Sequence, residues 1–143
     1  MRKLLTKRRL IERWPLKPIP GRVRQAKYRN RKTLYRGVLY DSAAEAARAA
    51  QLDLLVKAGK IHYWQRGTSQ VILDDGHGHK VRYKPDFMVC DKPFHRHAED
   101  VKGFVPQGFR IKAILWGLRF PNIPLRVIDK DGVEIRVLKE ATK

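Results

Sequence analysis

The spacing of hydrophobic and polar residues changes several times along the chain, and each change predicts an element. Residues 34–40 (LYRGVLY) alternate between large and other side chains, which is typical of a strand. The next stretch is rich in alanine and leucine and follows Asp41 and Ser42, residue types that commonly begin helices. A helix is therefore predicted from Ala43 until Gly59, a residue that suits the left-handed position after a helix end.

Further strand-like runs follow this helix, separated by turn-forming residues. Strands are predicted at 61–66, 69–73, 81–90 and 98–104, with a glycine-rich turn at 74–79 and a loop at 91–97. Apolar residues at 111, 114, 115 and 118 have helical spacing, so residues 108–120 are predicted as a second helix. Strands at 125–129 and 133–138 flank Lys130-Asp131-Gly132, a hairpin signal.

Two helices separated by runs of strands predict an α/β fold, in which a mixed central sheet is flanked by helices. The chain has 143 residues, of which 43% are hydrophobic, so it can bury one core. We expect one domain at 34–143, preceded by a basic N-terminal arm at 1–33. A single cysteine, Cys90, excludes an intrachain disulfide and is consistent with a reducing compartment, so the cytoplasm is the expected location.

Positive charge changes this picture most. The formal net charge is +18, and it is concentrated near the start of the chain. Residues 1–36 contain 14 Lys and Arg against one acid, whereas residues 37–143 contain 18 against 13. A surplus of this size predicts a polyanionic partner, most simply a nucleic acid.

The arm contains regularly spaced cations that suit contacts along a phosphate backbone. These are Arg22, Arg24, Lys27, Arg29, Arg31 and Lys32. A transit peptide is disfavoured because residues 1–36 contain no serine, and a membrane-surface helix is disfavoured because the apolar face is thin. Nor is any apolar run long enough to cross a membrane. Lys112, at the start of the second helix, is a further candidate for phosphate contact.

Candidate chemistry lies in a few acids within this basic chain. Asp100 and Lys102 are two residues apart, so on a strand they share one face, and Glu99 lies on the other. Asp86 ends an earlier extended run, and a hairpin-like arrangement would bring it to Asp100. Two carboxylates completed by water and phosphate suit Mg²⁺. A simple charge pair between Asp100 and Lys102 is the structural alternative.

Glu45 has two interpretations. It lies at the end of an inward-facing helical stripe with Ala49 and Leu52, where it would add a third carboxylate. Ser42 and Glu45 also fit a capping box, in which the glutamate only satisfies a backbone N–H. The spacing alone leaves both open.

The ordered set of segments YRGVLYDSAAEA, LDLLVKAGKI, YKPDF and EDVKG, followed by a helix with Lys112, resembles the PD-(D/E)XK nuclease superfamily. It is most similar to phage-borne domains of that superfamily and to archaeal-type Holliday junction resolvases, over residues 34–128. The resemblance implies a restriction-endonuclease-like core, with Asp86, Asp100 and Glu45 as metal ligands. It also implies that Lys102 orients or activates the attacking water. A β-bulge in this strand would exchange the faces of the two acids, so that Glu99 rather than Asp100 would be the metal ligand.

The resemblance thus predicts a Mg²⁺-dependent endonuclease, with Mn²⁺ as a substitute ion, that acts as a homodimer on four-way DNA junctions. If phage-encoded, it would work in the host cytoplasm. Two rivals remain open at this point. One is a related phage nuclease acting on flaps or linear duplex. The other is a basic nucleic-acid-binding protein without catalysis.

Overall fold

The computed structural model describes residues 30–67 and 69–137. In chain order, the elements are β1 (Thr33–Tyr35), β2 (Val38–Tyr40), α2 (Ala43–Lys57), β3 (Tyr63–Arg66), β4 (Val71–Asp74), β5 (Lys80–Tyr83), β6 (Phe87–Lys92), β7 (His95–Val101), α3 (Phe109–Arg119), β8 (Leu125–Ile128) and β9 (Glu134–Ile135). Both predicted helices are therefore confirmed. The arm cations Arg22, Arg24, Lys27 and Arg29 lie outside the described residues.

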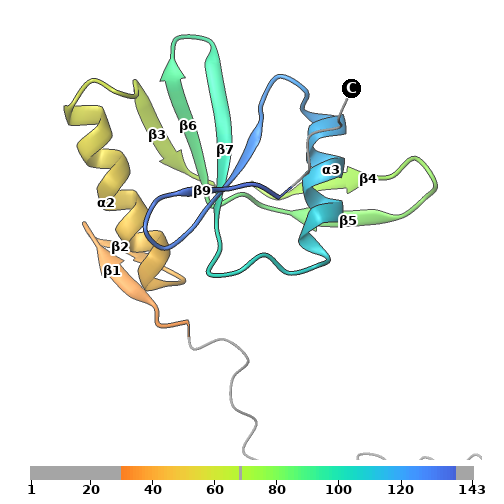
Figure 1. The fold of residues 1–143 in the computed structure, drawn as a ribbon, viewed down its shortest axis with the longest axis horizontal. Coiled ribbons are helices and arrows are strands. Elements are labelled where there is room, and N and C mark those ends of the chain that lie inside the picture. The colour runs from red at the N-terminus through yellow and green to blue at the C-terminus, as the bar shows by residue number, and fades with distance from the viewer. Residues whose placement is uncertain (1–29, 68, 138–143) are drawn as a thin grey trace, which may run out of the picture.

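A mixed five-stranded sheet forms the centre of the fold, in the order β3-β6-β7-β8-β9. Strands β7 and β8 are parallel, and α3 forms the crossover between them, whereas the other neighbours pair antiparallel. Helices α2 and α3 lie on either side of this sheet (Figure 1). The predicted α/β class with a mixed central sheet and flanking helices is thus confirmed.

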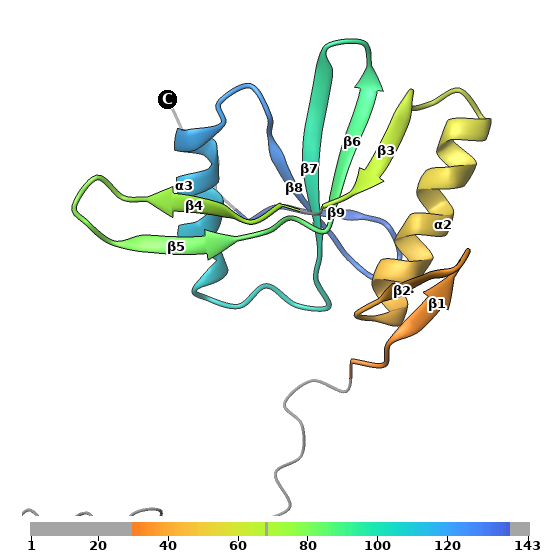
Figure 2. The same cartoon turned by 180° about the vertical axis from the view of Figure 1, so that it is seen from behind.

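Two hydrophobic clusters hold these layers together. On one face, Ala49 and Leu52 of α2 pack with Phe87 and Val89 of β6. The other face buries α3 against Ala98 of β7 and Val127 of β8, and the separate β4–β5 hairpin joins this cluster (Figure 2). Small alanines on α2, among them the buried Ala46 and Ala49, allow close approach to the sheet.

The end of α2 shows why its length could be predicted. Gly59 has a φ of 69°, and its N–H donates to the Val56 carbonyl, while Lys60 N–H donates to Leu55. This pair of hydrogen bonds satisfies carbonyls that the helix leaves free at its end. The hairpin around Asp131 and Gly132 is likewise present, since β8 and β9 pair antiparallel.

Several predicted strand boundaries were wrong, each because of a local turn. The predicted strand 34–40 is a hairpin, since Arg36 and Gly37 both have positive φ and reverse the chain. The run 81–90 is split between β5 and β6 around Pro85, which has no N–H for a sheet ladder. The predicted loop 91–97 is mostly strand, with a turn at Pro93 and Phe94, and β7 ends at Val101 rather than at 104.

Candidate functional site

A cavity of about 440 Å³ is lined by residues at the start of α2 and at the end of β7. The start of α2 and the end of β7 lie at the same end of the molecule (Figure 1). Its lining includes two predicted acids, Glu45 and Asp86, and the predicted lysine, Lys102. Asn30, the first described residue, also lines it, so the basic arm leads into the chain beside this cavity. Residues 45, 86 and 102 are thereby brought together from three separate segments.

Asp86 is held in place by the backbone on both sides. Its N–H donates to the Glu99 carbonyl at 2.9 Å, and its Oδ2 accepts from Val101 N–H at 2.8 Å. Its own carbonyl accepts from Gly67 N–H at 2.8 Å. A Cβ on Gly67 would lie only 1.9 Å from the Pro85 carbonyl oxygen, so a glycine is required for this approach. Pro85 and Asp86 are therefore held by hydrogen bonds between the residue after β3 and the last residues of β7.

Asp100 and Lys102 share one strand face, as predicted. Lys102 Nζ lies 2.8 Å from Asp100 Oδ1, and Asp100 Oδ2 accepts a 2.7 Å hydrogen bond from the Tyr83 hydroxyl. The Lys102 contact is an ion pair without hydrogen-bond geometry, so the buried Oδ1 has no hydrogen-bond partner. Burial, reinforced by the Asp100 charge, raises the pKa of Tyr83 far above its usual value, so this hydroxyl remains a donor.

The two aspartates repel each other electrostatically. Burial raises the pKa of Asp86 to about 7, and the negative charges of Asp100 and Glu45 add to this effect. The Val101 hydrogen bond and the Lys102 charge oppose it. Asp86 is therefore a carboxyl group that releases its proton near neutral pH, and an added cation would favour its charged form.

Glu45 combines parts of both interpretations. Ser42 is the N-cap of α2, and its Oγ accepts from Glu45 N–H at 3.1 Å, as in a capping box. The Glu45 carboxylate accepts from the same Oγ at 3.1 Å and still lines the cavity. Burial raises the pKa of Glu45 above its ordinary value. Helix capping therefore does not withdraw this carboxylate from the cavity.

Glu99 points to the opposite face, where it is fully engaged. Arg48 of α2 binds it through two contacts of 2.7 Å, and His97 Nε2 lies 3.0 Å from Glu99 Oε1. His97 Nδ1 in turn lies 2.7 Å from Asp91. Burial opposes ionisation of Glu99, but bonds to His97 and Arg48 outweigh it and hold its pKa below the usual value. The alternative exchange of Glu99 for Asp100 has no support in this geometry.

The donor set fits a hard divalent cation in part. Among the described residues, no group of three or more His, Cys, Asp or Glu side chains is arranged to hold a metal ion. Mg²⁺, however, usually takes only one or two carboxylates and keeps several waters. Asp86 and Asp100 provide two mutually repelling carboxylates, and Asp100 Oδ1 accepts no hydrogen bond, although the Lys102 ammonium lies 2.8 Å from it. They fit Mg²⁺ as a pair, with Glu45 as the third predicted ligand on the cavity wall.

The predicted phosphate-binding cations are only partly placed by the structure. Arg31 and Lys32 are exposed, directly after Asn30 at the cavity. Lys112 lies half-buried in α3 and does not line the cavity. The structure therefore does not bring Lys112 to the acids.

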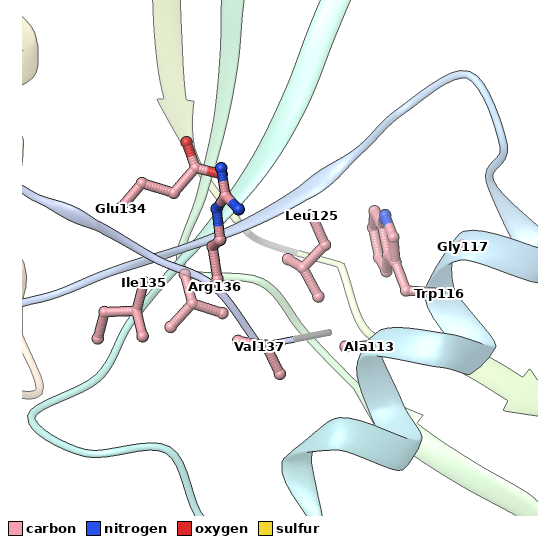
Figure 3. A pocket seen from close by; sticks show the side chains of 9 residues that line it. Ala113, Trp116, Gly117, Leu125, Glu134, Ile135, Arg136 and Val137 are labelled. Carbon is pink, nitrogen blue, oxygen red and sulfur yellow. The ribbon is translucent and has the colours of Figure 1, made fainter. Parts of the chain in front are cut away.

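A larger cavity of about 520 Å³ lies elsewhere, between α3 and the β8–β9 hairpin. Figure 3 shows Trp116 on one side of it and Glu134 and Arg136 on the other. Its remaining lining is mostly apolar, and among the described residues Glu134 is the single acid that lines it. The described residues therefore give the larger cavity no pair of carboxylates such as Glu45 and Asp86 in the smaller one.

Sequence reasoning missed three side chains that organise the site: Tyr83, Arg48 and His97. No spacing rule places Tyr83 near Asp100. His97 lies two residues before Glu99, so it shares a strand face with it, but this signal was lost because residues 91–97 were predicted as a loop. Arg48 had a usable signal, because it lies three residues after Glu45 and four before the buried Leu52, on an inward helix face. A charged residue on such a face requires a buried partner of opposite charge.

The fold and site define an α/β protein whose mixed sheet carries a half-buried aspartate, Asp86, and a buried one, Asp100, beside a lysine. Residues 25–132 match the family described as "Protein of unknown function (DUF1064)", and the chain belongs to this family. The matched range contains Glu45, Asp86, Asp100 and Lys102. No curated protein and no solved structure matches the chain. Within the described residues, no helix is long and apolar enough to span a membrane.

Proposed function

We propose that this protein is a Mg²⁺-dependent DNA endonuclease with a restriction-endonuclease-like core, related to the PD-(D/E)XK superfamily. The observation that carries the proposal is the convergence of Asp86, Asp100 and Lys102 at one end of the sheet, beside Glu45. Asp100 and Lys102 come from one strand end, Asp86 precedes the neighbouring strand β6, and Glu45 comes from α2; together they are the set that the resemblance singled out. A chance motif would not require this convergence.

Each residue has a distinct part in the proposed reaction. Asp86 and Asp100 hold the metal ion, with Glu45 completing the site; the ion, when bound, supplies Lewis-acid chemistry at a phosphodiester. The Lys102 side chain is 30% exposed and lines the cavity, while its ammonium group contacts the buried Asp100. It can orient a water or stabilise charge on the phosphate. The Val101 hydrogen bond positions Asp86.

DNA is the proposed substrate, and a four-way junction is the form we favour. The net charge of +18 supplies affinity for phosphates, and the arm meets the fold at the candidate site. A homodimer would place two such sites for symmetric nicks across a junction. Flaps, linear duplex and binding without cleavage are the competing outcomes.

One assay separates these outcomes. The full chain is incubated with labelled four-way junction, flap and linear duplex, each in Mg²⁺, Mn²⁺ or EDTA. Paired symmetric nicks in the junction support a resolvase, whereas cleavage of flap or duplex supports a different nuclease. Absence of cleavage on every substrate in both metals would contradict the enzyme.

Site assignment needs a matched pair of variants. Asp100→Asn keeps an acceptor for Tyr83 and should reduce cleavage by at least about 100-fold while leaving DNA binding in EDTA intact. Asp131→Asn, in the exposed β8–β9 turn, is the control and should cleave normally. Full activity of Asp100→Asn would remove Asp100 from the site.

A further inference from the structure

The turn between β6 and β7 carries an unusual residue. Lys92 and His95 are paired across the hairpin, so Pro93 and Phe94 form a two-residue turn. Phe94 has a φ of 67° and a relative exposure of 101%. Proline followed by a residue of positive φ is the pattern of a type II turn, whose second central position favours glycine or asparagine.

Neither packing nor backbone conformation favours a phenylalanine at this position. A bulky side chain in the left-handed region is strained, and a fully exposed ring gains nothing from burial within the chain. Strained residues of this kind concentrate at ligand-binding sites. The ring is therefore placed for contact with something outside the fold.

The surroundings of Phe94 indicate what that contact is. A hollow of about 280 Å³ adjoins the turn and is lined by His62, Tyr63, Cys90, Pro93, Phe94 and Arg96. Tyr63 is 45% exposed, and its ring centre lies 5.6 Å from that of His62. The hollow thus combines exposed flat rings with a guanidinium group. Nucleobases stack on such surfaces, because every base has a π-face.

The positive charge around the β6–β7 turn favours a nucleic acid over a protein segment as the partner of this hollow. Lys92 and Arg96 are exposed cations on either side of the turn. The nearest acid in sequence, Asp91, is bonded to His97 at 2.7 Å. A phosphate linked to a stacked base would therefore meet two positive charges and little opposing charge.

We propose that the hollow at the β6–β7 turn binds an unpaired nucleobase of DNA, with Phe94 and Tyr63 as stacking surfaces and Arg96 on the phosphate. The turn lies at the far end of β7 from Asp100, six residues away, or roughly 20 Å along the strand. If the proposed endonuclease function holds, this hairpin would set the cut at roughly six nucleotides from the unpaired base. Base binding itself does not depend on cleavage.

The test measures DNA binding in EDTA, where cleavage plays no part. Fluorescence anisotropy compares a perfect duplex with the same duplex carrying a short bulge of unpaired bases. Phe94→Gly suits the turn conformation, so its melting temperature should equal or exceed that of the wild type. It should bind the bulged DNA roughly 10-fold more weakly and the perfect duplex normally. Leu118→Ala, an exposed apolar residue on α3, is the matched control and should change neither affinity.

A second readout reports stacking directly. Fluorescence of 2-aminopurine in the bulge should be quenched by the wild type and by Phe94→Trp, and not by Phe94→Gly. Unchanged affinity and quenching in Phe94→Gly would overturn the inference, even if the wild type cleaves DNA. Equal weakening on both DNAs would also overturn it, since Phe94 would then be a general contact. Selective loss on bulged DNA would support it even if no cleavage is found.

Discussion

The carboxylate of Asp86 accepts a hydrogen bond from the backbone N–H of Val101 at 2.8 Å. This bond joins the residue before β6 to the last residue of β7 and places Asp86 beside Asp100. Its geometry depends on the antiparallel register of β6 and β7, in which Phe87 pairs with Glu99. The candidate site therefore depends on the pairing of β6 with β7 as well as on its own side chains.

Gly67 should be intolerant of any side chain. In Gly67→Ala, the new Cβ would collide with the Pro85 carbonyl and displace the Pro-Asp step. We expect the free energy of unfolding to fall by roughly 1–3 kcal/mol or more, with loss of the proposed cleavage. Gly117→Ala in α3, where a Cβ meets nothing within 4 Å, should instead gain roughly 0.5–1 kcal/mol. Urea denaturation of both variants checks this, and equal stabilities would contradict it.

Asp86 should make stability depend on pH. Its pKa is raised to about 7 in the folded state, against 3.8 as its ordinary value. Between these values the folded chain holds a proton that the unfolded chain has released. Its contribution to the free energy of unfolding is therefore present below pH 4 and is lost as pH rises to about 7.

Asp86→Asn removes this titration, so the difference in stability between variant and wild type isolates it from other groups. Urea denaturation in EDTA from pH 4.5 to 8 should show the wild type losing stability relative to Asp86→Asn as pH rises. A difference that stays constant across this range would show that Asp86 titrates normally.

Arg48 and Glu99 should stabilise the fold from the opposite face of β7. Their side chains are 12% and 2% exposed, so removing Arg48 takes two charge-assisted hydrogen bonds from the buried Glu99 carboxylate and leaves it only the His97 contact. Arg48→Ala should lower the free energy of unfolding by about 3–5 kcal/mol. Arg36→Ala, which removes the exposed ion pair with Asp53, should cost at most about 1 kcal/mol. Thermal and urea denaturation compare the two, and similar losses would contradict a buried pair.

The basic arm should control how DNA affinity depends on salt. Deletion of residues 1–32 ends just before β1 and removes Arg22, Arg24, Lys27, Arg29, Arg31 and Lys32. If all six contact phosphates, the slope of log affinity against log salt should flatten by about five. Titrations at several salt concentrations measure this slope, and circular dichroism verifies that residues 33–143 still fold. An unchanged slope would show that the arm does not contact DNA.

Local sequence determined much of the secondary structure. Ser42 and Gly59 marked the ends of α2, and the Asp131-Gly132 signal marked the β8–β9 turn, because caps and tight turns depend on a few neighbouring residues. Alternation also placed Asp100 and Lys102 on one strand face and Glu99 on the other, since this follows from strand geometry alone. By the same reasoning, a positive φ at Arg36 or Phe94 was not foreseen, because neither residue type favours it.

Only the tertiary structure decided which of these residues meet. The register of β6 and β7 brought Asp86 to Val101, and packing of α2 on the sheet paired Arg48 with Glu99. Tyr83 reached Asp100 from the separate β4–β5 hairpin. Contacts between segments depend on pairing and packing over the whole chain, which no local pattern encodes. Residue types and strand faces could therefore be read from the sequence, while the convergence of Glu45, Asp86 and Lys102 at one cavity, with Asp100 buried behind Lys102, required the fold.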